Sequence, residues 1–153
     1  MTVFREKLNL DGAWSLMTDP ENRGARERWF EQFPEQDAFS VTVPSVWDLW
    51  IPDYDGVGWY YRKFRLEPDW LDDYLELCFS AVNYYAEVWL NGYFLGAHEG
   101  GYTPFSFDLT PYIKYGVAQN LVVRADDVRR QFALYGKQGY GNARGIWQTV
   151  YLE

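Results

Sequence analysis

Carboxylates are the side chains of this sequence with the clearest chemical potential. Asp48, Asp53, Asp55 and Glu99 lie in or beside stretches rich in glycine, proline and aromatic residues. Two carboxyl groups held about 5 to 9 Å apart across a sugar can hydrolyse a glycosidic bond. Most of the 22 acidic residues of a folded chain nevertheless face solvent or lie at loop tips. The catalytic interpretation and the simpler surface interpretation therefore both stay open at this point.

Other kinds of catalytic centre find less support in the sequence. It holds one histidine, His98, and one cysteine, Cys78, which excludes metal sites built on several imidazoles or thiolates. A nucleophile paired with His98 would lack the G-x-S-x-G turn that exposes such a group. The stretches "GYGNARG" and "DGVG" match neither a phosphate loop nor a dinucleotide motif. We expect no metal and no cofactor, a polar His98 at a strand end and a buried Cys78 thiol.

Size and composition predict one globular domain. The chain has 153 residues, 48% of them hydrophobic and 20% aromatic, with a formal charge of -8. The negative charge argues against nucleic acid or an anionic membrane as a partner. Its 8 Trp and 13 Tyr suit a core and equally the face of a sugar ring. The first ten residues lack a signal-peptide core and no apolar run could span a membrane, so a cytoplasmic protein is expected.

The elements that would hold these side chains in place are predicted to be strands. Short apolar runs rich in Val, Leu, Phe, Tyr and Trp alternate with Gly, Pro, Asn and Asp, a pattern typical of an antiparallel sandwich or barrel. Asn91 and Gly92 lie between two such runs and predict a type I′ hairpin. The expected strands are 13–17, 40–43, 59–66, 74–81, 84–90, 93–98, 105–108, 120–125 and 145–152.

Three segments depart from the strand pattern. Segment 24–33, "GARERWFEQF", has an apolar stripe at helical spacing and predicts one short helix. Thr110 as N-cap and Pro111 at the first helical position predict a single turn after the strand that ends at Asp108. Segment 41–61 carries two prolines and two glycines among acidic and aromatic residues. A loop of this kind between strands is expected to be functional.

Six motifs follow one another along nearly the whole chain. They are "LNLDGAWSL" with "DP" at 8–20, "VTVPSVWD" at 41–48, "DYDGVGWYYRKF" at 53–64, "SAVNYYAEVWLNGYFLGAHEGGYTPFSFDLT" at 80–110, "NLVVRADD" at 120–127 and "GKQGYGNARGIWQTVYLE" at 136–153. In this order they resemble the N-terminal sugar-binding domain of glycoside hydrolase family 2, the family of β-galactosidases, β-glucuronidases and β-mannosidases. The resemblance implies an all-β jelly-roll sandwich similar to the galactose-binding fold.

The resemblance also implies where catalysis takes place. Both catalytic glutamates of the family lie in a downstream (β/α)₈ barrel, which by itself needs roughly 200 residues or more. Residues 1–153 are therefore expected to form a single non-catalytic domain that lacks the barrel. In the "GGYTPFSFD" turn, Gly100 and Gly101 would adopt a conformation that other residues resist, while Tyr102 and Phe105 would enter the core.

Two segments of the resembling family reach toward its sugar pocket. The residues that match them here are Asp55 in the first segment and Asn142 or Arg144 in the second, where Gln138 and Tyr140 are equal candidates to Asn142. An aspartate accepts hydrogen bonds from sugar hydroxyls, and an arginine donates in a fork. Asp55 could instead be a turn residue before a glycine. Arg144 could instead form a structural ion pair or stack on Trp147.

Two main hypotheses about function follow. The first is a non-catalytic domain that supports the barrel of a retaining glycoside hydrolase and lends polar groups to its glycan pocket. Its expected partners are a glycan or glycoside substrate and the downstream domains of the parent enzyme. The second is a stand-alone carbohydrate-binding module that stacks sugars on exposed rings of Trp47, Trp50, Trp59 and Tyr140. A pure assembly domain, recognisable by an exposed aromatic patch, is the third possibility.

Overall fold

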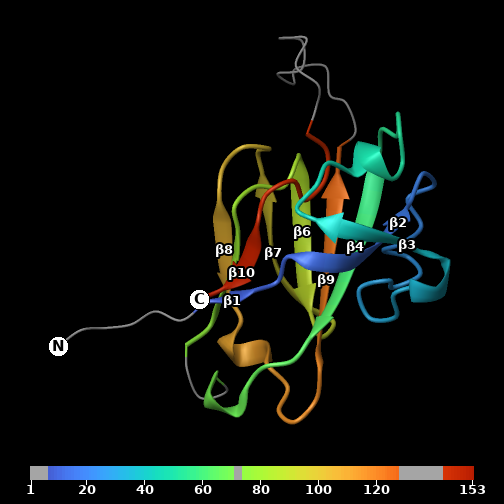
Figure 1. Ribbon diagram of the computed structural model, residues 1–153. Helices are drawn as coiled ribbons and strands as arrows, with labels where there is room; N and C mark the ends of the chain where they lie inside the picture. Colours follow the sequence, from blue (N-terminus) through green and yellow to red (C-terminus); the bar gives the residue numbers. More distant parts are fainter. Residues whose placement is uncertain (1–6, 71–73, 128–142) are drawn as a thin grey trace.

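The domain is a sandwich of two antiparallel sheets. A computed structural model of the chain describes residues 7–70, 74–127 and 143–153 (Figure 1). The larger sheet has the strand order β3 (Phe39–Val43), β2 (Gly12–Thr18), β4 (Val57–Phe64), β9 (Gln119–Asp126), β6 (Tyr85–Leu90) and β7 (Tyr93–Glu99). The smaller sheet has the order β1 (Leu8–Asn9), β10 (Val150–Leu152), β5 (Glu76–Phe79) and β8 (Phe105–Asp108). The expected all-β sandwich is confirmed.

Most predicted strands are confirmed to within two residues. The exception is the last one, expected over 145–152, because only Val150–Leu152 pairs as a strand, with β5 on one side and β1 on the other. Gly145 instead forms an isolated bridge with Asn83. In the described part of the chain the helical elements are four single turns of 3-10 helix, at Glu35–Asp37, Trp47–Leu49, Pro68–Trp70 and Thr110–Tyr112. Among the described residues, no helix has the length and apolar character needed to cross a membrane.

The main core fills the space between the two sheets. Side chains alternate along the strands, so that Tyr60 from β4 and Val123 from β9 meet Leu77 from β5 and Leu152 from β10 in one buried cluster. Cys78 lies on the same strand as Leu77 and is buried, as the sequence predicts. This shared core fixes the two sheets to one another and therefore the loops at their ends.

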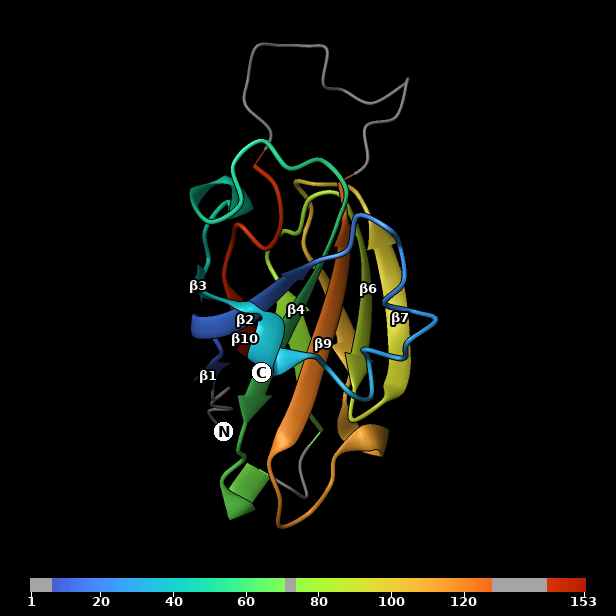
Figure 2. The same cartoon turned by 90° about the vertical axis from the view of Figure 1, so that its right-hand side faces the viewer.

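A second apolar cluster covers the outer face of the larger sheet. Segment 19–38 crosses this face in front of β9 and β6 (Figure 2). It places Trp29 edge-on against Trp59, at 5.7 Å between ring centroids, and Trp59 stacks on Trp89 at 5.3 Å. Residues 57–60 of β4 are consequently buried without alternation. A strand covered on both faces has this continuous apolar pattern.

The helix predicted over 24–33 is wrong, although its apolar stripe does face the core. The segment forms consecutive turns in which Arg28 takes a left-handed conformation, φ 59°. That conformation ends any right-handed helix at this point. Gly24 also packs so tightly that an added Cβ would lie 2.5 Å from the Trp59 ring. Phe30 nevertheless stacks on Trp89 at 5.2 Å, as an apolar stripe on this segment requires.

Two turn predictions are confirmed, the second with a different N-cap. The type I′ hairpin is confirmed, because Asn91 has φ 53° and Gly92 has φ 85°. The single turn at Thr110–Tyr112 is also confirmed, but its N-cap is Leu109. The Thr110 hydroxyl instead accepts a hydrogen bond from the backbone N–H of Leu75, at 3.0 Å, and so joins the turn to the residue before β5 of the same sheet.

The "GGYTPFSFD" turn is only partly as expected. Gly100 has φ 126°, which favours glycine. Gly101 is needed for a different reason, because an added Cβ would lie 2.6 Å from the Asn83 side chain. Tyr102 was expected in the core but is 63% exposed, so this prediction is wrong. Phe105 is half-buried at the edge of the core, where it stacks on Phe79.

Candidate functional site

Three segments meet at one end of the sandwich, the upper end in Figure 1. They are the loop 44–56, the residue that follows β9 and the stretch 143–146. Backbone hydrogen bonds join them: Trp47 N–H donates to Arg144 O at 2.9 Å, and Asp127 N–H donates to Gly56 O at 2.8 Å. These bonds bring polar side chains from three distant parts of the sequence to one place.

Arg144 lies at the centre of this polar cluster, surrounded by three carboxylates. Its Nη2 lies 2.7 Å from Asp55 Oδ1, its Nη1 lies 3.3 Å from Asp48 Oδ1 and its Nε lies 2.9 Å from Asp127 Oδ2. The Arg144 side chain is only 9% exposed, whereas the side chains of Asp48 and Asp55 are 41% and 44% exposed. One buried cation thus orients two carboxylates that also face solvent.

Asp127 is the buried member of the cluster, with a side chain only 1% exposed. Its contact with Arg144 is an ion pair in which the Nε–H is not aligned for a hydrogen bond. Among the described residues no donor is aligned with its carboxylate. Burial raises the pKa of Asp127 to about 7, with the charges of Asp55 and Asp48 acting in the same direction and Arg144 against it.

This raised pKa predicts a specific dependence of stability on pH. From its ordinary pKa of 3.8 up to about 7, Asp127 holds a proton in the folded chain that the unfolded chain releases. The folded state therefore loses stability as pH rises through this window, and the loss is complete above the folded-state pKa. Urea unfolding from about pH 5 to about pH 8 should show the effect in wild type but not in Asp127→Asn. A constant difference between the two proteins across this range would contradict it.

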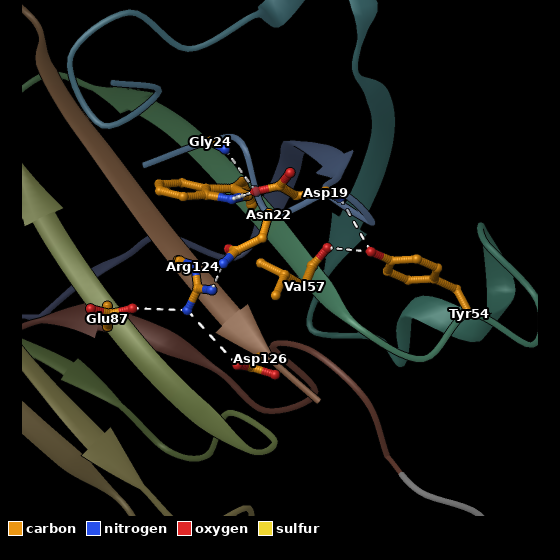
Figure 3. A network of polar contacts seen from close by, with 9 residues as sticks. Asp19, Asn22, Gly24, Tyr54, Val57, Glu87, Arg124 and Asp126 are labelled. Carbon is orange, nitrogen blue, oxygen red and sulfur yellow. Dashed lines mark hydrogen bonds and ion pairs between the residues drawn. The ribbon is translucent and has the colours of Figure 1, made fainter. Parts of the chain in front are cut away.

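The loop that carries Asp55 is held by a second polar network (Figure 3). The Tyr54 hydroxyl donates to Val57 O at 2.7 Å and accepts from the Asp19 N–H at 3.2 Å. The buried Asp19 carboxylate accepts from Gly24 N–H at 2.8 Å and from Trp59 Nε1–H at 2.9 Å. The position of the loop is therefore tied to the segment that covers the larger sheet.

Arg124 forms the other half of this network on the outer face of the larger sheet. Its Nη1 lies 2.9 Å from Glu87 Oε1 and 3.9 Å from Asp126 Oδ2, and its Nη2 donates to Asn22 Oδ1 at 2.9 Å. All these side chains are engaged with one another (Figure 3). Arg124 is thus a structural arginine that connects β9 and β6 to segment 19–38.

The structure places the predicted site residues in different surroundings. It brings Asp55 and Arg144 together, in the ion-pair arrangement considered for Arg144. Trp59 is 0% exposed within the second apolar cluster, so its ring offers no face to a ligand in this structure. Asn142 and Gln138 lie outside the described residues.

Sequence reasoning missed the role of Asp127 and considered Asp48 only as a catalytic candidate. The sequence signal for Asp127 was the acidic pair in "NLVVRADD", because an acid that directly follows a buried strand lies at the end of the sheet. Within the described residues Trp147 does not stack on Arg144; its ring meets Tyr102 edge-on, and its indole N–H donates to Gly101 O at 2.9 Å.

His98 and Cys78, the other two side chains with catalytic potential, do not lie together in a catalytic centre. His98 stacks on Phe105 at 4.3 Å and its Nε2 lies 3.2 Å from Thr103 Oγ1, while Cys78 lies on a strand of the other sheet. Burial lowers the pKa of His98. Among the described residues, no group of histidine, cysteine and acidic side chains has the arrangement of a metal site.

Comparison with known protein families identifies the fold's relatives. Residues 48–152 match the family described as "Glycosyl hydrolases family 2, sugar binding domain". The chain belongs to glycosyl hydrolase family 2. The matched range of this family 2 domain contains Asp48, Asp55, Asp127 and Arg144, and so the whole polar cluster.

Individual members of the family agree in sequence and in structure. The domain is 35% identical over 114 residues to a β-glucuronidase of Paenibacillus borealis, and 43% identical over 107 residues to a β-galactosidase of Thermoanaerobacter pseudethanolicus. These matches cover 71% and 66% of the chain. A solved β-glucuronidase of Lactobacillus rhamnosus superposes with a TM-score of 0.86 at 26% identity over 99% of the chain. The chain spans only 19%, 14% and 29% of these three proteins.

Proposed function

We propose that this family 2 domain supports a catalytic domain and lends carboxylates to the rim of its glycan pocket. The observation that carries the proposal is the placement of Asp48 and Asp55, both partly exposed and both held by the buried Arg144. A carboxylate accepts hydrogen bonds from two neighbouring sugar hydroxyls. When the carboxylate is fixed in advance, less entropy is lost on binding.

Arg144 has a different part in this proposal from Asp55. Its guanidinium is almost fully buried and directed at three carboxylates. We therefore assign it a positioning role, in which it holds the Asp55 loop, rather than a direct contact with sugar. Asn142 and Gln138 shortly precede it in the sequence and are proposed as further polar contacts on the same rim.

The bond-breaking step is proposed to belong to the rest of a larger protein. Relatives carry the names β-glucuronidase and β-galactosidase, and the chain spans less than a third of their length. Hydrolysis of a glycosidic bond with retention needs two carboxyl groups about 5 Å apart, with one of them acting as nucleophile. Asp48 and Asp55 instead share one partner, because both form ion pairs with the buried Arg144.

The test is Asp55→Asn in the complete enzyme that contains this domain. We expect KM for an aryl glycoside to rise about tenfold, because charge-assisted hydrogen bonds to sugar are lost, with a smaller change in kcat. Asp53→Asn is the matched control, since Asp53 is exposed on the same loop and contacts no residue of the cluster. Equal kinetics for Asp55→Asn and wild type would overturn the pocket role. Release of nitrophenol from nitrophenyl glycosides by the pure 153-residue chain would overturn the non-catalytic role.

The alternative hypothesis, a stand-alone carbohydrate-binding module, needs exposed aromatic rings, and among the described candidates only Trp50 is exposed. Trp47 and Trp59 are both 0% exposed, and Tyr140 lies outside the described residues. Trp50 is 37% exposed and directly follows the 3-10 turn Trp47–Leu49 that contains Asp48 of the polar cluster. A single ring gives a small stacking surface, whereas useful affinity for a glycan needs several. The geometry therefore favours the pocket role over the module.

A further inference from the structure

A groove runs along the outer face of the larger sheet, at the end remote from Arg144. It consists of two adjoining hollows with volumes of about 420 Å³ and 280 Å³. Phe30, Glu31 and Asn120 line both hollows and so mark the place where they join. Segment 24–33 forms one wall, and the start of β9 and the β6–β7 turn form the other.

This groove is distinct from the polar cluster around Arg144. Asn120 lies near the start of β9 and Asp127 directly follows its end. Seven residues of extended strand separate them, which corresponds to roughly 23 Å. The first residues of β9 and the turn at Thr110–Tyr112 lie at the lower end of Figure 1, opposite the loop 44–56. The two sites share no residue, so the inference below goes beyond the proposed function.

Hydrogen-bond donors without a partner line the groove. Lys63 and Lys114 each face one hollow, and within the described part of the chain neither ammonium group has an acid at ion-pair distance. Asn120 lies directly opposite Lys63 across the β4–β9 pair. Its Oδ1 accepts from the Tyr61 hydroxyl at 2.7 Å, which leaves the Nδ2 amide group to donate into the groove.

These two lysines differ from the arginines that form ion pairs in the described part of the chain. Four arginines each form an ion pair with an acid: Arg23, Arg28, Arg124 and Arg144. In the groove itself Glu31 is already neutralised, because both of its oxygens pair with Arg28. Glu35 is the other acid on the groove wall. With Arg28 included, the groove carries three cations and two acids, a small net positive charge in a chain with a formal charge of -8.

Aromatic rings form the apolar part of the groove wall. Tyr93 is 57% exposed on the rim of the larger hollow, where Tyr112 supports its ring at 5.5 Å. Phe30 is fixed by its stacking on Trp89. Such rings present flat faces to the C–H groups of a sugar, while the neighbouring polar groups bind its hydroxyls.

We propose that this groove binds a short acidic saccharide, a disaccharide in which one sugar carries a carboxylate. The carboxylate pairs with Lys114 in the larger hollow or with Lys63 in the smaller one, the Asn120 amide donates to a ring substituent, and a sugar face packs on Tyr93. A volume of about 420 Å³ for the larger hollow lies in the range of sites that bind small molecules. The charged donors select the acidic sugar over its neutral counterpart.

The test compares cellobiouronic acid with cellobiose, its neutral counterpart, on the ¹⁵N-labelled 153-residue chain. We expect the acid to shift the backbone signals of Gly92 and Lys114 and the side-chain amide signal of Asn120, with saturation below about 10 mM. Cellobiose should bind at least about tenfold more weakly. Equal affinities, shifts confined to the surroundings of Arg144, or no saturable shift would each overturn the proposal.

A pair of variants tests the lysines directly. Lys63→Gln combined with Lys114→Gln should weaken binding of the acid about tenfold or more while the spectrum of the unbound protein keeps its dispersion, because both side chains are exposed. Lys7→Gln is the matched control, since Lys7 lies over the Tyr151 ring of the other sheet. Unchanged affinity in the double variant would show that the lysines do not select the ligand.

Discussion

Arg144→Met is expected to lower the free energy of unfolding by about 3 to 5 kcal/mol. The variant removes the one cation at ion-pair distance from the 1% exposed Asp127 carboxylate within the described residues. It also releases Asp48 and Asp55 from their shared partner, so three acids come to repel one another. Urea unfolding at about pH 8, where Asp127 is charged, measures the effect.

Two further variants separate the buried charge from the size of the side chain. Asp127→Leu combined with Arg144→Met replaces the buried pair by apolar groups and should restore most of the stability lost by Arg144→Met alone, because no uncompensated charge stays buried. Arg65→Met is the matched control for loss of an exposed arginine and should change stability by less than about 0.5 kcal/mol. A double variant as unstable as Arg144→Met would show that shape, and not charge, decides at this position.

Gly145→Ala is expected to cost about 3 kcal/mol of unfolding free energy. Gly145 has φ 85°, which strains any other residue, and an added Cβ would lie 2.0 Å from the hydroxyl of the buried Tyr60. That hydroxyl accepts a hydrogen bond from Ile146 N–H at 3.2 Å, so it cannot move away without loss. The substitution thus combines backbone strain with a steric conflict in the core, directly beside Arg144.

A second glycine, Gly116, serves as a control that isolates the backbone strain from the steric conflict with Tyr60. Gly116 has φ 77° but no heavy atom within 4 Å of an added Cβ, so Gly116→Ala should cost only about 1 kcal/mol. Adding Tyr60→Phe to Gly145→Ala removes the oxygen in conflict, and the two changes should cost less together than their sum. Thermal unfolding of the four variants, including Tyr60→Phe alone, gives the comparison. Similar losses for Gly145→Ala and Gly116→Ala would show that the Tyr60 conflict is absent.

The sequence predicted strands well because each strand leaves a local pattern. The hairpin at Asn91 and Gly92 depends on the φ values of two adjacent residues, which their chemistry reveals directly. Segment 24–33 has the apolar spacing of a helix, yet tertiary contacts decide its conformation: Gly24 must lie against Trp59, and the chain then turns at Arg28. No local pattern reveals that a tryptophan on another strand occupies the necessary space.

The candidate site was predictable only in part. Asp55 and Arg144 were found through motifs of the family, whereas their meeting depends on three chain segments that only the fold brings together. The burial of Asp127 could not be foreseen, because an acid after a strand faces solvent or core according to what covers that end of the sheet. Trp59 illustrates the same limit, since an indole that suits a sugar face suits a core equally well.

The indole cluster on the outer face of the larger sheet also gives this domain an optical property. Trp59 and Trp89 stack at 5.3 Å with their planes 21° apart, and Trp29 contributes a third ring from segment 19–38. Electronic transitions of rings held this close couple, and the coupling produces a paired positive and negative band in circular dichroism. Trp29 belongs to the covering segment, while the other two belong to the sheet. The part of the band pair that comes from coupling between Trp29 and Trp59 therefore reports, without any label, whether segment 19–38 lies on the sheet.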